Sequence, residues 1–220
     1  MAGYLILGAG KFGRLALARL ARLDKQARFL VVDRNARALA AARDLAPARG
    51  EWVAAEAGAY LAAHLENGVS WDWLIPMIPE HVAFSWLRGR HLTPPAWEAL
   101  AVPAELASLA TVASRGREGE LYLSRASHLC PDDCPGPREC PVTGEPRETP
   151  LFAELAVFQA PGFKMVVIPS RQLAPGVGGY PPGLLRVMAR DLAGFRGKVL
   201  IATACRCHGV VHALERQAGE

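Results

Sequence analysis

A short stretch near the N-terminus has the spacing of a phosphate-binding turn. An apolar run over residues 4–7 passes into a Gly-x-Gly-x-x-Gly pattern and then into an Ala/Leu-rich segment, so a strand should lead through a tight turn into a helix. Glycine lets the backbone approach a pyrophosphate, and the helix start offers N–H groups and the positive end of its dipole. Gly8, Gly10 and Gly13 are predicted to hold the pyrophosphate of a dinucleotide, and Lys11 and Phe12, at the helix start, are also predicted to bind this cofactor.

An acid placed for the adenosine ribose follows the second apolar run, residues 29–32. Asp33 closes that run, and a carboxylate at the end of the second strand accepts hydrogen bonds from ribose hydroxyls in dinucleotide sites. Its negative charge would repel a 2′-phosphate and favours NAD over NADP, although Arg34 beside it keeps NADP open. The alternative is an ordinary strand–helix–strand unit in which the glycines make a turn and the acid is solvated.

The cysteines indicate a metal site in the second half of the chain. All five fall in two groups: a loop group in which each cysteine precedes a proline, and a close pair followed by His208. A proline-rich loop buries little apolar surface of its own and needs another source of stability. In a reducing compartment, where disulfides rarely form, a bound metal could provide it. The predicted metal ligands are Cys130, Cys134, Cys140, Cys205 and Cys207.

The identity of that metal stays open between zinc and an iron–sulfur cluster. Three thiolates from the loop and one from the pair would complete a four-sulfur site, and His208 could replace one of them. The spacings fit neither a paired zinc finger nor the bacterial ferredoxin run, although Cys-Pro is a ferredoxin-like detail. The alternative is a set of ordinary thiols.

Two further residues are candidates for substrate contact and catalysis. The segment from Pro76 to His81 follows a predicted strand, at the edge where ligands of open α/β sheets bind. There Pro76 would contact the cofactor, and His81 the substrate or the nicotinamide. A Gly/Pro-rich loop over residues 169–180 follows another predicted strand, and Arg171 in it could bind a phosphate or a carboxylate. A histidine that only caps a helix and a plain surface turn are the alternatives.

Composition argues against several classes of protein. The 220 residues are 51% apolar and 21% charged, which is typical of a folded chain with a substantial core. The net charge of +4 is small and the basic residues are scattered, so no nucleic-acid partner is expected. The first apolar run lacks a preceding basic region, and residues 93–113 are broken by prolines and acids. We therefore expect a cytoplasmic protein without membrane insertion.

The alternation of strand and helix signals predicts an α/β fold that positions these residues. Over residues 1–92 it predicts a Rossmann-like, doubly wound parallel sheet that binds the dinucleotide. The strands expected there are 4–7, 29–32, 52–53 and 73–75, and the helices after the one at the glycine turn are 36–45, 60–65 and 80–87. Residues 93–220 are expected to form a Cys-rich α/β half that extends the first sheet or builds its own.

The second half has its own series of expected elements. These are helices over 104–113, 151–158, 184–192 and 210–214, strands over 121–124, 165–168 and 199–203, and an irregular Pro/Cys-rich loop over 130–150. A helical course near the C-terminus would place His208 and His212 one turn apart, a spacing that suits a metal or a solvated face.

Three motifs of the first half resemble one known family. They are Gly8–Arg14, Val31–Arg34 and Ala55–Ala57, which are similar to the glycine turn, the ribose-binding acid and the third-strand signature of the regulatory NAD-binding domains of bacterial potassium transport systems, the RCK or KTN family. Glu56 stands where that family has Asp, and the resemblance ends near Leu92. It implies a Rossmann domain that binds an adenine dinucleotide, and a regulatory role in transport.

Two functions are therefore expected as alternatives. The first is an NAD(H)-binding, oxidoreductase-like protein that acts on a small molecule and holds a Cys-ligated metal or iron–sulfur site next to the nucleotide cleft. The second is a non-catalytic sensor of NAD(H) or an adenine nucleotide, such as a regulatory subunit of a potassium transport system, working as a homodimer or through a protein partner. A hydride carries two electrons and a single cluster accepts one, so direct exchange between them would need a flavin.

Overall fold

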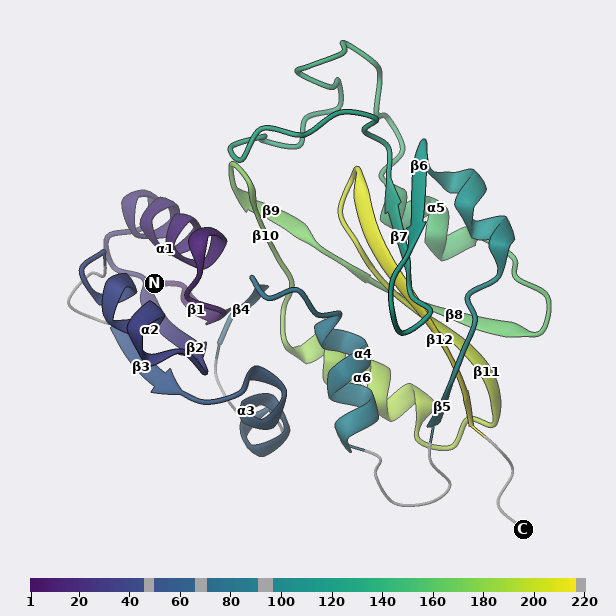
Figure 1. Ribbon diagram of the computed structural model, residues 1–220, viewed down its shortest axis with the longest axis horizontal. Helices are drawn as coiled ribbons and strands as arrows, with labels where there is room; N and C mark the ends of the chain where they lie inside the picture. Colours follow the sequence, from purple (N-terminus) through teal and green to yellow (C-terminus); the bar gives the residue numbers. More distant parts are fainter. Residues whose placement is uncertain (46–49, 66–70, 91–96, 217–220) are drawn as a thin grey trace. The chain divides into compact units, whose positions relative to one another are not determined.

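The computed structural model describes residues 1–45, 50–65, 71–90 and 97–216 (Figure 1). The chain divides into two compact units, each considered by itself. The first unit comprises residues 1–89 and 171–186, and the second comprises residues 90–170 and 187–220. This division differs from the expected one, which placed the boundary at 92/93, in that residues 171–186 pack with the N-terminal part.

The first unit is built on a parallel sheet. Its described strands are β1 (Gly3–Leu7), β2 (Arg28–Asp33), β3 (Gly50–Ala54) and β4 (Trp73–Pro76), in the spatial order β3-β2-β1-β4. All neighbours in this order run parallel, and Leu7 is in register with both Val32 of β2 and Pro76 of β4. The carboxyl ends of these strands meet at one edge, and the predicted Rossmann-like α/β fold class is confirmed.

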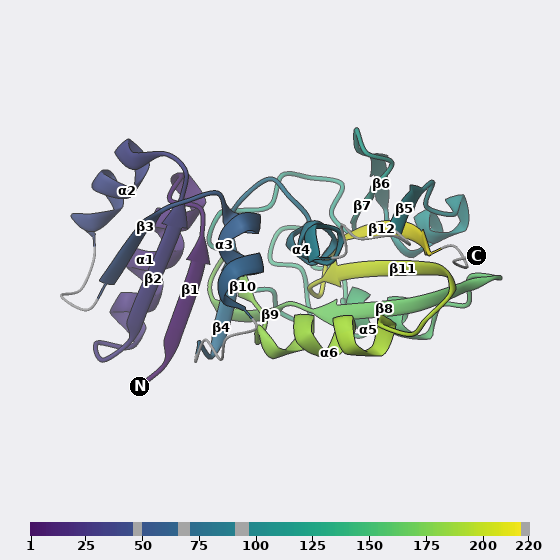
Figure 2. The ribbon, with the colours of Figure 1, turned by 90° about the horizontal axis from the view of Figure 1, so that it is seen from below.

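Helices cover both faces of this sheet (Figure 2). They are α1 (Lys11–Leu23), α2 (Ala36–Arg43) and α3 (Ala57–His64), and helix α4 (Val82–Arg90) follows β4 in the chain. Successive residues of a strand point to opposite faces. Ile6 belongs to the core cluster that contains Leu17 of α1 and Leu39 of α2, whereas Leu5 lies beside Leu61 of α3. Burial on both sides explains why the strand is a continuous apolar run.

The first unit also contains a β-hairpin from the second half of the chain. Strands β9 (Arg171–Ala174) and β10 (Val177–Gly179) run antiparallel around a turn in which Gly176 has φ +65°. Tyr180 then exchanges two backbone hydrogen bonds with Leu74 of β4, with N–O distances of 2.8 and 3.0 Å. The Gly/Pro-rich segment predicted as an open loop is therefore regular structure, because its glycines serve the hairpin turn and the approach to β4.

The second unit has a sheet of its own, which is one of the two arrangements that the sequence left open. Its described strands are β5 (Trp97–Leu100), β6 (Val112–Arg115), β7 (Leu121–Ser124), β8 (Phe163–Pro169), β11 (Gly197–Ala204) and β12 (His208–Arg216). Their order is β6-β7-β12-β11-β8, with β5 also paired to β12, and only the β8–β11 pair is parallel among the described strands of this sheet. The 3₁₀ helix η1 (Ala104–Leu109) and helices α5 (Leu151–Val157) and α6 (Gly183–Leu192) complete the regular elements of the described residues.

The helix predicted over 210–214 is wrong, because these residues belong to β12. This strand lies between β7 and β11, and it is buried on both faces, as Val211 on one face and Leu214 on the other show. A strand that is buried on both faces lacks polar alternation, and its pattern cannot be told from that of a short buried helix. His208 and His212 are therefore separated along an extended strand instead of lying one helical turn apart.

The helix predicted over 104–113 is also partly wrong, since η1 occupies its start and β6 its end. The short strand β5 was not predicted. The other expected helices and strands are present within three residues of their predicted bounds, and the loop over 130–150 contains only an isolated bridge between Glu139 and Pro146. Within the described residues, no helix combines the length and apolar character needed to cross a bilayer.

Candidate functional site

Two of the three glycines in the turn of the first unit are required by close packing. Gly8 has φ +102°, and its N–H donates to the carbonyl oxygen of Val32 over 2.8 Å. A Cβ atom at position 8 would lie 2.6 Å from the carbonyl oxygen of Met77, and one at Gly13 would lie 1.9 Å from that of Gly8. Neither position accepts a side chain unless the main chain moves, so these glycines hold the turn against α1 and the end of β4.

Gly10 differs from the other two, because no described atom lies within 4 Å of the Cβ position that it leaves empty. It is the N-cap of α1, and among the described residues no side chain caps this helix and no acid lies in its first turn. The first helical hydrogen bond runs from Arg14 N to Gly10 O at 3.0 Å, so the N–H groups before Arg14 lie outside the helical ladder. Lys11 and Phe12 are exposed there. The helix start thus combines open space with a positive potential.

Asp33 ends β2 beside this turn. Its Oδ2 accepts a hydrogen bond from Ala9 N at 2.6 Å, and its Oδ1 accepts one from Asn35 N at 2.7 Å. The carboxylate is therefore fixed against the loop, and each oxygen can still accept a bond from a ligand hydroxyl. Arg34 follows as an exposed side chain, and Pro76 ends β4 at the same edge. The residues predicted to bind the cofactor are thus gathered at one edge of the sheet.

The two residues predicted to act on a substrate occupy other kinds of position. His81 directly precedes α4, is buried, and stacks on Phe84 with the ring centroids 6.5 Å apart. Arg171 is exposed at the start of β9, in register with Gly179. A buried guanidinium at position 171 would have required an anion nearby, but an exposed one is satisfied by water.

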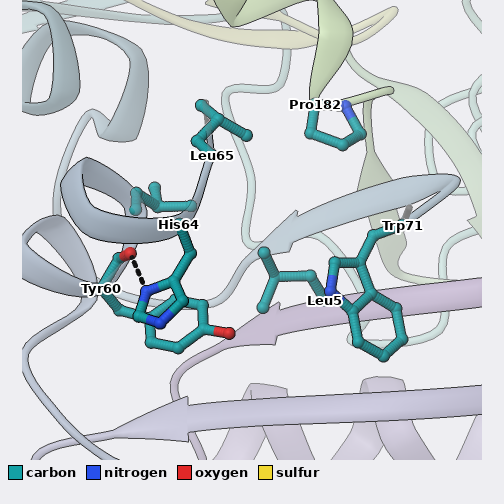
Figure 3. Close-up of a pocket in the computed structure, with 7 residues that line it drawn as sticks. Leu5, Tyr60, His64, Leu65, Trp71 and Pro182 are labelled. Atoms are coloured by element: carbon teal, nitrogen blue, oxygen red, sulfur yellow. Dashed lines mark hydrogen bonds between the residues drawn. The ribbon is translucent and has the colours of Figure 1, made fainter. Parts of the chain in front are cut away.

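A small apolar pocket of the first unit is formed by different residues (Figure 3). It is a narrow crevice without room for a water molecule, and it is lined by Leu5, Tyr60, Leu61, His64, Leu65, Trp71 and Pro182. His64 stacks on Tyr60 with centroids 4.1 Å apart, and its Nδ1 lies 2.9 Å from the Tyr60 carbonyl oxygen. Because the lining is apolar apart from these rings, we assign the pocket to the packing of α3 on the sheet.

The second unit brings the two groups of cysteines together. One group lies in the tight turn between β11 and β12, which a hydrogen bond from Cys205 N to His208 O closes at 2.8 Å. His208 Nε2 lies 3.7 Å from Cys130 Sγ of the loop, and its Nδ1 lies 4.0 Å from Cys205 Sγ. We refer to the following residues as the thiol cluster: His128, Cys130, Cys134, Cys140, Cys205, Cys207 and His208.

His128 is a member of this cluster that sequence reasoning missed. Its Nε2 lies 3.9 Å from Cys140 Sγ, and its Nδ1 is buried without a hydrogen-bond partner among the described residues. The sequence signal that could have found it is the His-x-Cys spacing to Cys130, which repeats the Cys-x-Cys spacing of the second group.

Arg147 was also missed, and it places a positive charge next to the thiols. It is only 7% exposed, and it donates from Nη2 to Glu145 at 2.8 Å and from Nη1 to the carbonyl oxygen of Arg125 at 2.6 Å. Burial raises the pKa values of Cys130 and Cys207, and the positive charge of Arg147 offsets part of that increase. No local pattern marks this residue, because only the folded loop buries it.

Charge interactions connect all five thiols. Burial is the largest effect that raises the pKa of Cys130, and the thiolates of Cys134, Cys140 and Cys205 raise it further. Burial likewise raises the pKa of Cys207, followed by the charges of Cys205, Cys134 and Cys130. Deprotonation of the cluster therefore accumulates negative charge that a bound cation would relieve.

Two of the thiols are favoured as thiolates by hydrogen bonds. The side chain and N–H of Thr143, followed by the N–H of Val142, lower the pKa of Cys140 to about 7. Burial raises the pKa of Cys205, but hydrogen bonds from the His208 side chain and from main-chain N–H groups outweigh it, including one from His208 N at 3.3 Å. The thiolate is the form of cysteine that binds metals.

The five cysteines are thiols and form no disulfide in the described structure. Within the described residues, no three His, Cys, Asp or Glu side chains are already arranged as ligands of one metal ion. The cluster is instead a set of close donor pairs, made of sulfur and imidazole groups. These are the donors that zinc and iron–sulfur clusters use.

An open pocket of about 330 Å³ borders the thiol cluster at Arg147. Its lining residues are Ser108, Leu109, Ala110, Thr111, Arg125, Pro146 and Arg147. Arg125 forms an ion pair with Glu154 and donates to the carbonyl oxygen of Thr149. Because Arg147 belongs both to this wall and to the surroundings of the thiols, a small molecule in the pocket would lie close to the cluster.

Comparisons with known proteins connect the chain to relatives along almost its whole length. A family model described as the C-terminal domain of an uncharacterized protein matches residues 83–217, which include the thiol cluster. An uncharacterized protein of Archaeoglobus fulgidus is 32% identical over 223 residues, covering 96% of this chain and 99% of its own. No solved structure matches. The chain therefore belongs to the family of this archaeal protein.

Proposed function

We propose that this protein binds NAD(H) at the glycine turn and acts as an oxidoreductase-like enzyme, with a Cys-ligated metal or iron–sulfur site in its second unit. The observation that carries the proposal is the open helix start at Gly10 beside the fixed carboxylate of Asp33. A pyrophosphate on helix N–H groups and a ribose on a strand-end carboxylate are the two contacts by which such a turn holds a dinucleotide.

The surrounding residues support this assignment. Gly8 and Gly13 keep the turn tight, so that Gly10 is the position where the main chain is left open to a ligand. The hydrogen bond from Ala9 N fixes the Asp33 carboxylate against the same turn. Its negative charge favours NAD over NADP, while exposed Arg34 offers a weaker route to a 2′-phosphate.

The reaction class is hydride transfer between the nicotinamide and a small molecule. The hydride moves with its electron pair to the acceptor, and solvent supplies the proton that completes the reduction. The thiol cluster supports a metal through its donor chemistry and the negative charge that its thiolates would share. We assign this metal a structural or redox-sensing role, since a hydride cannot pass directly to a one-electron centre.

A non-catalytic sensor of NAD(H) or an adenine nucleotide is the second candidate, in keeping with the resemblance to RCK or KTN domains. The positions of the two expected catalytic residues favour the sensor over the enzyme. His81 is packed on Phe84 and Arg171 is exposed on a hairpin, and neither position is typical of a catalytic residue. In this case the bound nucleotide would change the interaction with a protein partner or a second copy of the chain.

Isothermal titration calorimetry of the full chain with NAD⁺, NADH and NADP⁺ tests the binding step. We expect NAD⁺ or NADH to bind, and Gly10→Val to abolish the heat, because the side chain would fill the space above the helix start. Gly194→Val is the matched control, since Gly194 also has open space around its Cβ position but lies in the second unit.

An activity assay on the same samples distinguishes an enzyme from a sensor. Loss of reduced-nicotinamide absorbance with a panel of small-molecule oxidants supports the oxidoreductase, and tight binding without turnover supports the sensor. Absence of heat with every dinucleotide in the unmodified chain would overturn both.

A further inference from the structure

The thiol cluster contains more metal donors than one ion can use. In the described part of the chain it comprises five thiols and two imidazoles, drawn from the 130–150 loop, its preceding residues and the turn between β11 and β12. A tetrahedral ion binds four donors. Two tetrahedral ions that share one bridging thiolate need seven, which is the number of donors present.

The spacing of the donor pairs fits tetrahedral coordination. Zinc–sulfur and zinc–nitrogen bond lengths put a sulfur and a nitrogen on the same tetrahedral ion about 3.6 Å apart. The described pairs lie at 3.7 Å for Cys130 and His208, 3.9 Å for Cys140 and His128, and 4.0 Å for Cys205 and His208. An imidazole binds one ion through one of its nitrogens, and His208 faces Cys130 with Nε2 but Cys205 with Nδ1. The pairs of Cys140 with His128 and of Cys130 with His208 therefore need only a small adjustment, whereas Cys205 must move toward the nitrogen that faces Cys130; no three donors converge within the described residues.

Cys130 is the donor that connects the two groups. Its sulfur lies 3.7 Å from His208 Nε2 of the turn, and it stands two positions after His128, whose ring nitrogen lies 3.9 Å from the sulfur of the loop residue Cys140. His128, by contrast, contacts the loop residue Cys140, and its buried Nδ1 has no partner among the described side chains. The donors thus divide into a loop group and a turn group with Cys130 between them.

The charges also suit two dications. Two Zn²⁺ ions would offset four of the five thiolate charges, and the remaining negative charge would lie near the buried guanidinium of Arg147, which also pairs with Glu145. An iron–sulfur cluster held by four thiolates would leave one cysteine and both histidines unused.

We propose that the thiol cluster binds two Zn²⁺ ions that share the sulfur of Cys130. The ion of the loop group is completed by His128, Cys134 and Cys140, and the ion of the turn group by Cys205, Cys207 and His208. This inference rests on the metal part of the proposed function and does not depend on NAD(H) binding.

Metal analysis of the full chain purified from zinc-supplemented medium gives the first test. We expect about two zinc atoms per chain and no acid-labile sulfide. One zinc atom per chain, or iron with sulfide, would overturn the two-ion site while leaving a metal site in place. A chain without any of these metals would overturn the metal part of the proposed function as well.

Titration of the metal-free chain with Co²⁺ tests the shared sulfur. Two Co²⁺ ions bridged by a thiolate couple magnetically, so the electron paramagnetic resonance signal per ion should fall as the second equivalent binds. A signal that doubles would mean two separate sites and would overturn the bridge. This measurement uses the unmodified protein, so it does not depend on the folding of any variant.

Variants then assign the ligands. His128→Gln should reduce the zinc content from two atoms to one, and Cys130→Ser should remove the magnetic coupling. His64→Gln is the matched control, because His64 lies on α3 of the first unit and should leave two zinc atoms in place. Full zinc content in His128→Gln would remove this residue from the site and overturn the seven-donor arrangement.

Discussion

A Cβ atom at Gly13 would lie 1.9 Å from the carbonyl oxygen of Gly8, far inside the contact distance of two such atoms. These two glycines are therefore required by the fold, whereas Gly10 between them faces open space. One short motif thus combines two positions that the packing needs with one position that a ligand can use, and mutation can separate the two roles.

Gly13→Ala should destabilise the protein and Gly10→Ala should not. The first change forces the main chain apart and should cost about 1–3 kcal/mol or more. The second should cost no more than about 1 kcal/mol, the difference between glycine and alanine as an N-cap. It should nevertheless weaken NAD(H) binding about tenfold or more, because the new methyl group lies where the pyrophosphate approaches. Urea unfolding and calorimetry measure the two effects, and equal stability of the two variants would contradict the packing argument.

Asp33→Asn should shift the preference between the two dinucleotides. Removal of the negative charge weakens the hold on the ribose hydroxyls and also removes the repulsion of a 2′-phosphate. The ratio of the NADP to the NAD dissociation constants should therefore fall about tenfold, which corresponds to about 1.4 kcal/mol. Arg34→Gln is the opposing control, because loss of this exposed cation should raise the same ratio. An unchanged ratio in both variants would remove these residues from the ribose site.

Glu120 should make the second unit sensitive to acid. Its carboxylate accepts hydrogen bonds from Glu118 N at 2.8 Å and the Tyr122 hydroxyl at 3.2 Å, and it lies 4.0 Å from His212 Nε2. Burial raises the pKa of Glu120, but the hydrogen bonds and His212 bring it below its ordinary value of 4.5. The stability it contributes is therefore fully present above pH 4.5 and is lost as the pH falls through the lowered pKa.

Glu120→Gln should accordingly make the stability of the protein less dependent on pH in the acid range. We expect the urea midpoint of the unmodified protein to fall more steeply than that of the variant below about pH 4.5. Glu105→Gln, a change at an exposed glutamate, should follow the unmodified protein. Parallel curves for Glu120→Gln and the unmodified protein would show that this carboxylate has the same pKa before and after folding.

Tyr180→Phe should keep or increase the stability of the first unit. The side chain is fully buried, its hydroxyl has no hydrogen-bond partner among the described residues, and burial raises its pKa. Removal of an unsatisfied buried hydroxyl should stabilise by up to about 1–3 kcal/mol, while the main-chain bonds to Leu74 are retained. Tyr180→Ala should instead cost about 3–5 kcal/mol, because it leaves a cavity. A clear loss of stability in the phenylalanine variant would contradict the unsatisfied state of the hydroxyl.

Much of the first unit could be predicted from the sequence because its signals are local. The glycine spacing, the acid at Asp33 and the apolar runs of β1 and β2 each lie within a few residues of the structure they specify. Because the strands are parallel and joined by helices, the topology alone places their carboxyl ends at one edge of the sheet. The predicted cofactor residues consequently lie together as expected.

In the second unit, local sequence signals are not sufficient to predict every helix and strand. Whether residues 210–214 form a helix or a strand is decided by β7 and β11, which pair with them from distant parts of the chain. The hairpin of β9 and β10 likewise owes its place to the bonds between Tyr180 and Leu74.

The amino-acid sequence by itself indicated that the five cysteines and His208 could bind a metal, since thiols and imidazoles are recognisable by type. Only the tertiary structure decided that Cys130 lies against His208, that His128 faces Cys140, and that Arg147 is buried beside them. The physical reason is that the loop carrying most of these groups has almost no regular structure of its own. Its course is set by contacts with the turn between β11 and β12, such as the hydrogen bond from Arg206 Nη1 to the carbonyl oxygen of Arg147, and these contacts exist only once the sheet has formed.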